Sequence, residues 1–162
     1  MSAPLAFAQH DHAQCRRQAL AQVETRCAER GLRLTPVRRR ALEILLETHK
    51  ALGAYDLLRR LAADGLGSQP PVAYRALDFL VAHGFAHKIE SLNAFVACAQ
   101  PDGHETAAPA FMICRDCGTV GEALAPDGAG GLSDAARQTG FALDQTVIEA
   151  EGTCPDCKGT QT

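Results

Sequence analysis

The stretch PPVAYRALDFLVAHGFAHKIESLNAFVAC, residues 70–98, decides the fold of this chain. Its first half repeats apolar residues three and four positions apart and stops at Gly84, which predicts a helix with one buried face. That face consists of Ala73, Ala76, Leu77 and Leu80. Its second half alternates apolar and polar residues around Ser-Leu-Asn, residues 91–93, which predicts a two-stranded hairpin.

Three more helical patterns precede this stretch. We expect helices over residues 11–31, 35–49 and 54–65, and the second has the clearest start, because Thr35 can cap it and Pro36 suits its first position. Short helices followed by a hairpin are typical of a winged helix-turn-helix. Among the histidines, we assign His10 and His12 to an N-terminal tail. His49 lies near a predicted helix end, and we assign it a structural role.

In a winged helix-turn-helix the last helix enters the DNA major groove. With the apolar face turned inward, Tyr74, Arg75 and Asp78 point outward. Arginine can bind guanine through two hydrogen bonds, although a surface arginine paired with Asp78 would look the same in sequence. Residues 1–98 carry 13 Lys and Arg against nine Asp and Glu, a net charge of +4, whereas residues 99–162 carry −7. The charge difference favours a polyanionic partner for the first half.

The second half reads as a small α/β unit. Residues 99–110 are rich in Pro, Gly and polar residues and are expected to form a linker. Strands are predicted over residues 111–114 and 141–152, with a helix over 132–140 between them. We therefore divide the chain into a domain over residues 1–98, a hinge over 99–110 and a domain over 111–162. The last has few apolar residues, so it needs a further source of stability.

Two C-x-x-C pairs supply that source. The chain has no charged leader segment typical of secretion, so the expected compartment is the cytoplasm, where thiols stay reduced. Seven cysteines, an odd number, in that compartment favour metal binding or free thiols over disulfides. Four thiolates in two tight turns suit a closed tetrahedral structural zinc site. A thioredoxin-type redox pair, or two unrelated pairs, are the alternatives. The four cysteines are Cys114, Cys117, Cys154 and Cys157.

Four further residues bracket the junction of the two halves. They comprise two imidazoles, one thiol and one carboxylate, a set that could bind a second zinc ion tetrahedrally. Each alone is more often a surface histidine, a packed cysteine or a solvated glutamate. The four are His87, Cys98, His104 and Glu122.

These residues carry a family resemblance. The segments GLRLTPVRRRALEIL, GAYDLL and AYRALDFLVAHGFAHKIESLNAFVAC, together with the two C-x-x-C pairs, resemble the ferric-uptake-regulator family, and HKIESLNAFVAC is most similar to its zinc-uptake-regulator branch. The resemblance implies a homodimeric, metal-dependent DNA-binding repressor, with an α+β fold of an N-terminal winged helix-turn-helix and a small α/β dimerisation domain. It also implies roles for the residues identified above: structural zinc on Cys114, Cys117, Cys154 and Cys157, regulatory zinc on His87, Cys98, His104 and Glu122, and base contacts from Tyr74 and Arg75.

The sequence departs from the family pattern in two places. Val72 and Ala73 stand where relatives usually have Thr or Ser followed by Val, so a hydroxyl that could cap the helix or contact phosphate is missing. The segment before the first C-x-x-C holds one histidine, whereas iron-type relatives have a run of them, so a third family metal site is not expected.

The predicted function is zinc-responsive repression of zinc-uptake genes through double-stranded operator DNA, without enzymatic activity or membrane insertion. A regulator sensing iron, manganese or peroxide on the same fold is the nearest alternative, and a zinc-stapled protein-interaction module is another. A zinc hydrolase or deaminase is disfavoured, because four cysteines close the site to water, His104 directly adjoins Glu105, and Ile113 precedes Cys114 where deaminases have Pro.

Overall fold

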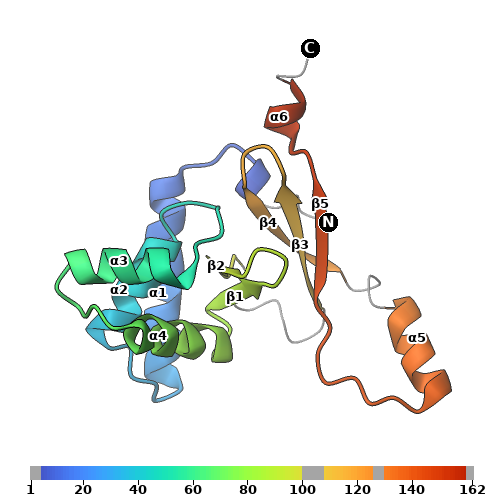
Figure 1. Cartoon of the computed structure of the whole chain (residues 1–162), viewed down its shortest axis with the longest axis horizontal. Coiled ribbons are helices and arrows are strands. Elements are labelled where there is room, and N and C mark those ends of the chain that lie inside the picture. The colour runs from blue at the N-terminus through green and yellow to red at the C-terminus, as the bar shows by residue number, and fades with distance from the viewer. Residues whose placement is uncertain (1–4, 100–107, 126–129, 160–162) are drawn as a thin grey trace. The chain divides into compact units, whose positions relative to one another are not determined.

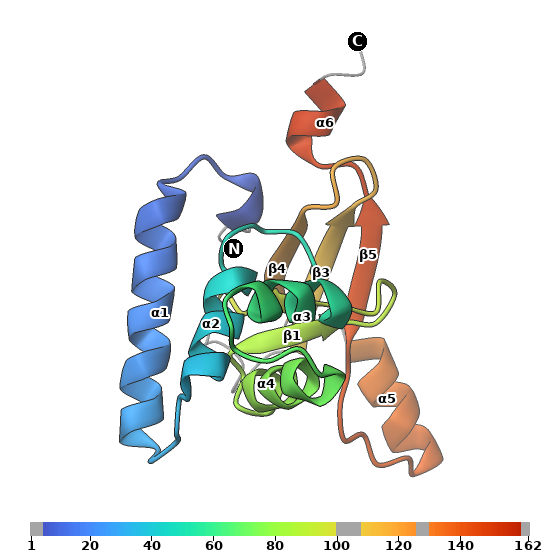
Figure 2. The same cartoon turned by 60° about the vertical axis from the view of Figure 1, so that its left-hand side comes forward.

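The structure, a computed structural model, describes residues 5–99, 108–125 and 130–159. Its fold is α+β, as predicted, and its internal contacts divide it into two compact units. The N-terminal unit is Gln9–Pro101, and the C-terminal unit combines Met1–Ala8 with Asp102–Thr162. Each unit is described separately below (Figures 1 and 2). None of the described helices is long and apolar enough to cross a membrane.

The N-terminal unit is a winged helix-turn-helix, which confirms the prediction. The helices are α1 (His12–Glu29), α2 (Pro36–Leu45), α3 (Ala54–Ala63) and α4 (Pro70–Ala82), and the wing is the hairpin of β1 (Ala86–Ile89) and β2 (Ala94–Ala97). The predicted cap is present, because the Thr35 hydroxyl accepts a hydrogen bond from the backbone N–H of Arg38. The Asp11 carboxylate caps α1 in the same way, accepting a hydrogen bond from the backbone N–H of Gln14.

The core of this unit is built from leucines on the inner faces of α2, α3 and α4. The predicted inner face of α4 is buried, and Leu77 and Leu80 have no exposed surface. Leu57 and Leu61 of α3 are equally buried. Full burial of one such side chain stabilises the fold by about 1.5–3 kcal/mol, so the helical periodicity that predicted α4 is also what holds it in place.

The wing is joined to the helices through the backbone. β1 and β2 pair antiparallel, with His87 opposite Val96. Leu52, between α2 and α3, exchanges two backbone hydrogen bonds with Phe95 of β2, at 2.8 and 2.9 Å. The hairpin is therefore extended by one bridge to the segment after α2.

The C-terminal unit is a three-stranded sheet with two short helices. The strands β3 (Ala108–Cys114), β4 (Val120–Ala125) and β5 (Ile148–Gly152) lie in the order β4-β3-β5, with β3 antiparallel to β4 and parallel to β5. The helices are α5 (Gly130–Thr139) and α6 (Pro155–Gly159). Two predictions were wrong in detail: residues 141–147 are not part of a strand, and residues 108–110 belong to β3 rather than to the linker.

A segment from the start of the chain completes this unit. The short 3-10 helix η1 (Leu5–Phe7) contacts β4. The Phe7 ring lies so close to Gly121 that a Cβ atom there would be 2.3 Å from it. Gly121 is therefore the residue that lets the aromatic ring approach the strand. No pattern in the sequence predicted this contact.

Candidate metal centre and nucleic-acid interface

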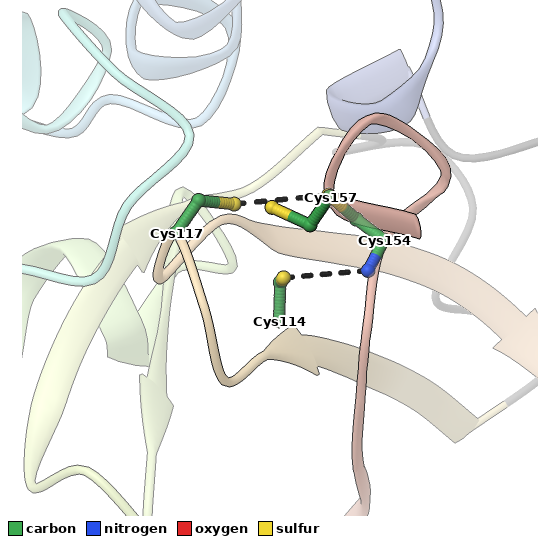
Figure 3. A group of neighbouring side chains, drawn as sticks. All are labelled: Cys114, Cys117, Cys154 and Cys157. Carbon is green, nitrogen blue, oxygen red and sulfur yellow. Dashed lines mark hydrogen bonds between the residues drawn. The ribbon is translucent and has the colours of Figure 1, made fainter. Parts of the chain in front are cut away.

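The two C-x-x-C pairs come together at one end of the sheet. Cys114 ends β3, and Cys154 follows β5, two parallel strands in which Cys114 pairs with Gly152. Because neighbouring parallel strands end at the same edge, the two pairs meet there. One sulfur atom from each of the four cysteines lies within 4.8 Å of the others (Figure 3). No disulfide joins any of them.

The turns at this edge aim the sulfurs inward. Gly118 has a φ of +74°, and its N–H donates to the carbonyl of Cys114 at 2.9 Å, which closes the first turn. The backbone N–H of Cys154 donates to Cys114 Sγ at 3.3 Å, and the Sγ atoms of Cys117 and Cys154 lie 3.8 Å apart (Figure 3). The sulfur–sulfur distance expected across a tetrahedral zinc ion is about 3.8 Å, given Zn–S bonds of about 2.3 Å. The donor set and its spacing therefore fit zinc.

Hydrogen bonds also adjust the acidity of these thiols. The backbone N–H groups of Cys117 and Cys154, in that order, lower the pKa of Cys114 to about 6. Hydrogen bonding to Thr119 lowers the pKa of Cys117. By contrast, the hydrogen bond to Cys154, followed by burial, raises the pKa of Cys157. In the absence of metal, these hydrogen bonds favour the thiolate forms of Cys114 and Cys117, the first C-x-x-C pair.

Two of the predicted regulatory ligands lie on the wing. His87 is in β1, and Cys98 follows β2, where its N–H donates to the carbonyl of Phe85 at 3.0 Å. In this register, His87 and Cys98 belong to the same face of the hairpin as diagonal neighbours. Their ligand atoms lie within 4.8 Å of each other. A thiol and an imidazole at this spacing fit two positions of a metal site.

Of the other two predicted ligands, only Glu122 lies among the described residues. Glu122 is in β4, opposite Phe111 of β3. His104 lies outside the described residues.

The outer face of α4 presents the predicted DNA-contacting pair. Tyr74 is 42% exposed, and Arg75 is exposed as well. The predicted alternative, an ion pair between Arg75 and Asp78, does not occur in the described part of the chain, where Arg75 has neither an ion pair nor a hydrogen bond. The guanidinium is therefore available to a partner. The position before this pair also has a structural explanation: Pro70 and Pro71 lack N–H groups, and the N–H of Val72 donates to the carbonyl of Gln69 at 2.9 Å, so no hydroxyl cap is needed.

The arginines of α2 are in use inside the unit. Arg39 forms ion pairs with Glu24 and Glu43. Arg40 pairs with Asp64 at 2.6 Å and with Glu43 at 3.4 Å. These intramolecular partners favour a structural role for both side chains over contacts with DNA phosphate.

Sequence reasoning missed one group. His10, His12 and His49 had been assigned to a tail and to a helix end, but the structure brings their ring nitrogens within 4.8 Å of one another. The assignment of His12 to a tail was wrong, because His12 is the first residue of α1. No spacing motif connects these residues, since His49 is distant from the other two in sequence.

A winged helix with an exposed arginine on its last helix, joined to an α/β unit with a four-thiol cluster, defines a class of two-domain winged-helix regulators with a cysteine-rich second domain. Comparisons with known proteins agree with this class. The Ferric uptake regulator family matches residues 29–151. The chain belongs to this family, which confirms the resemblance found in the sequence and the expectation of a regulator rather than an enzyme.

The most informative relatives come from one branch of the family. The zinc uptake regulation protein of Escherichia coli (strain K12) is 44% identical over 138 residues, 85% of this chain and 80% of that protein. A solved zinc uptake regulator complexed with zinc and DNA is 41% identical, with a TM-score of 0.84 over 90% of this chain and 97% of that one. Holo XcZur is 39% identical, with a TM-score of 0.78 over 87% and 97%.

Proposed function

We propose that this protein is a zinc-responsive transcriptional repressor, which binds operator DNA as a homodimer when zinc occupies its regulatory site. The likeness to relatives described as zinc uptake regulators supports zinc as the signal and zinc-uptake genes as the targets. The observation that carries the proposal is the close approach of His87 and Cys98 as diagonal neighbours on the wing of the unit whose last helix exposes Arg75. A regulator of this kind acts in the cytoplasm.

In this proposal the protein holds two zinc ions per chain, in sites with different tasks. The first is structural and is bound by Cys114, Cys117, Cys154 and Cys157. It ties the ends of β3 and β5 together in a unit whose apolar core is small. Structural zinc contributes about 10 kcal/mol or more to the folding of comparable small units, so this site would stay filled at all physiological zinc levels.

The second ion is the signal. Its ligands are His87 and Cys98 from the wing, with His104 and Glu122. A thiolate among the ligands favours tetrahedral zinc over iron or manganese, which prefer oxygen-rich octahedral sites. Zinc that favours one arrangement of the two recognition helices raises the affinity for DNA, and linkage requires DNA to raise the affinity for zinc by the same factor.

The DNA-binding residues are Tyr74 and Arg75 at the start of α4. Because the outer face of this helix exposes both side chains, the major groove is their natural target. A dimer places two such helices on successive half-sites, and the spacing of the half-sites follows from the distance between the helices.

Dimerisation is assigned to the C-terminal unit, within residues 111–162. Its share of exposed large apolar side chains is high for so small a unit: Met112, Leu132, Phe141, Leu143 and Val147. Only Ala136 of α5 is buried in the single chain. Apolar side chains that stay exposed in one chain are expected to be covered by a partner, and a second copy of this chain is the partner that the family implies.

The proposal is tested by measuring operator binding at buffered free zinc. Wild-type protein should shift the operator only as free zinc rises, and Cys98→Ser should fail to respond. Cys15→Ser is a matched control, because Cys15 is a half-buried cysteine outside every cluster of metal-ligating residues found among the described side chains. Equal binding by wild type and Cys98→Ser in the absence of zinc would exclude zinc gating.

The alternative of an iron, manganese or peroxide sensor on the same fold makes a different prediction. In competition between zinc and iron at equal free concentrations, the proposed site retains zinc and the protein binds the operator in the zinc form. A protein that binds operator only after loading with iron or manganese would support the alternative.

A further inference from the structure

Three histidines of the N-terminal unit meet where α1 begins and α2 has just ended. His10 precedes α1, His12 is its first residue, and His49 follows α2 by four residues. The ring centroids of the three pairs lie 4.8–5.7 Å apart, and one ring nitrogen from each lies within 4.8 Å of the others. All three side chains are partly buried. This cluster is separate from the residues that the proposed function uses.

His12 has the orientation of a metal ligand. Its Nε2 lies 2.9 Å from the carbonyl oxygen of Glu47. A carbonyl oxygen only accepts, so Nε2 carries the proton and the Nδ1 lone pair is left available. Nδ1 is buried, and among the described residues it has no hydrogen-bond partner. A histidine that donates one ring N–H to a backbone carbonyl and keeps the lone pair of its second nitrogen has the arrangement usual for a ligand of a protein-bound metal.

His10 and His49 have the spacing of two ligands on one ion. Their Nε2 atoms lie 3.3 Å apart. Two nitrogens that bind one tetrahedral zinc ion at about 2.0–2.1 Å are separated by about 3.3 Å. Burial, then the neighbouring His12 and His10, lowers the pKa of His49, which favours the neutral imidazole that binds metal ions.

We propose that His10, His12 and His49 form an additional zinc site, in which three imidazole nitrogens bind the ion and water occupies the fourth position. Imidazole nitrogen is a ligand that zinc prefers. The alternative without metal is a histidine cluster held by hydrogen bonds. That alternative explains the contact between His10 and His49, but it leaves the buried Nδ1 of His12 without a partner.

Such an ion would fasten the start of α1 to the end of α2. The chain passes from the C-terminal unit to the N-terminal unit between Ala8 and Gln9, so the ion would be bound directly after this crossing. The site therefore fixes the end of one of the chain's two connections between the units.

Zinc stoichiometry tests the proposal on full-length protein. After equilibrium dialysis at one buffered free zinc concentration, His12→Gln and His49→Gln should each hold one zinc ion per chain fewer than wild type. Gln at position 12 retains a donor for the Glu47 carbonyl but lacks the second ring nitrogen. The matched control is His83→Gln, because His83 is a histidine of the same unit that contacts Phe79 and Phe85 instead of the cluster. Equal stoichiometry in all four proteins would overturn the proposal.

Cobalt spectra separate this site from the two sites of the proposed function. In the Cys98→Ser background, with zinc kept in the four-cysteine site, Co²⁺ bound to the histidine cluster should give d–d absorption without a sulfur-to-cobalt charge-transfer band, and His49→Gln should remove that absorption. If Cys98→Ser instead leaves every zinc property unchanged, the proposed regulatory site fails, while the result for the histidine cluster stands.

A third measurement needs no variant and covers the case in which a substitution disturbs folding. Wild-type protein is treated with diethyl pyrocarbonate with and without zinc, and the modified histidines are located by mass spectrometry. Zinc should protect His10, His12 and His49 and leave His83 unprotected. Unchanged modification of all three cluster histidines would contradict the proposal.

Discussion

Substitution of Arg75 tests the proposed DNA contact directly. Arg75→Ala should weaken binding to the operator by about 5- to 150-fold, because a bidentate arginine–guanine contact is worth about 1–3 kcal/mol and 1.4 kcal/mol corresponds to a factor of ten. Its free energy of unfolding should change by less than about 0.5 kcal/mol, as is usual for surface sites away from special features. Arg75 is exposed and without an ion pair or hydrogen bond among the described residues, so no intramolecular contact is lost.

The assay is fluorescence anisotropy with zinc-loaded protein, using an operator obtained by selection from random DNA and variants of that operator changed at single base pairs. Arg75→Lys keeps the charge but loses the planar fork. A base-reading arginine predicts that Arg75→Lys loses discrimination at one guanine position while the salt dependence stays close to wild type. A phosphate-contacting arginine instead predicts uniform weakening by Arg75→Ala and a salt slope reduced by about one.

The charge-matched control is Arg137→Ala. Arg137 is an exposed arginine of α5 in the C-terminal unit, where it pairs with Asp134. The Arg137→Ala substitution removes the same charge from a residue outside the winged helix, so the operator affinity of this variant should stay close to wild type. Wild-type affinity and wild-type base preference in both Arg75→Ala and Arg75→Lys would refute the assignment of α4 as the reading helix.

Four further substitutions test the fold and the structural site. Leu77→Ala, at a side chain without exposed surface, should lower the free energy of unfolding by about 2–5 kcal/mol in urea denaturation. Gly84→Ala should cost about 1–2 kcal/mol in the same assay through its φ of +74° alone, since a Cβ there meets no atom within 4 Å; an unchanged midpoint would contradict this. Cys114→Ser should lose the structural zinc and, in sedimentation, the dimer, whereas a zinc-free but native dimer would show that zinc is not the staple. Gly121→Ala should displace the ring of Phe7 and expose residues 5–7 to limited proteolysis, and wild-type resistance would show that the ring shifts without release.

The helices of the N-terminal unit could be predicted from sequence because each carries its own information. The apolar period, the Thr35 cap and the glycine stops are local signals, and they located α2 and α4 to within a few residues. The wing could be predicted equally well, because its two strands are adjacent in sequence and their apolar and polar residues alternate. In this unit the residues that the local patterns place on inner faces are also the ones that tertiary packing buries, so packing did not change the secondary structure that local propensity predicts.

The C-terminal unit was harder because its order depends on distant partners. β5 pairs with β3 in parallel, across a long excursion that includes α5, and nothing in residues 141–147 distinguishes the part that stays outside the sheet. The contact of Phe7 with Gly121 joins the first residues of the chain to its fourth strand. Contacts between segments so far apart in sequence produce no repeating residue pattern in either segment, so the sequence alone does not predict them.

The candidate sites divide in the same way. The spacing of Cys114 and Cys117, repeated at the end of β5, predicted the four-thiol cluster, because two residues between ligands are a local requirement of the turn. The histidine cluster followed no such rule. His49 joins His10 and His12 only because α2 packs beside α1, so the group became visible only in the folded chain.

The arrangement of residues 70–98 shows how one stretch could take part in both proposed roles, metal binding and DNA binding. α4 buries its leucines on one side and presents Arg75 on the other. At its end, the N–H of Phe85 donates to the carbonyl of Leu80 at 2.8 Å, and the carbonyl of Phe85 accepts from the N–H of Cys98 at 3.0 Å. Two backbone hydrogen bonds therefore connect the proposed zinc ligand to the last turn of the proposed reading helix. An ion bound to Cys98 and His87 would act on the same rigid element that holds Arg75, so zinc need not reshape the core to affect DNA binding; it needs only to bias where this element is held.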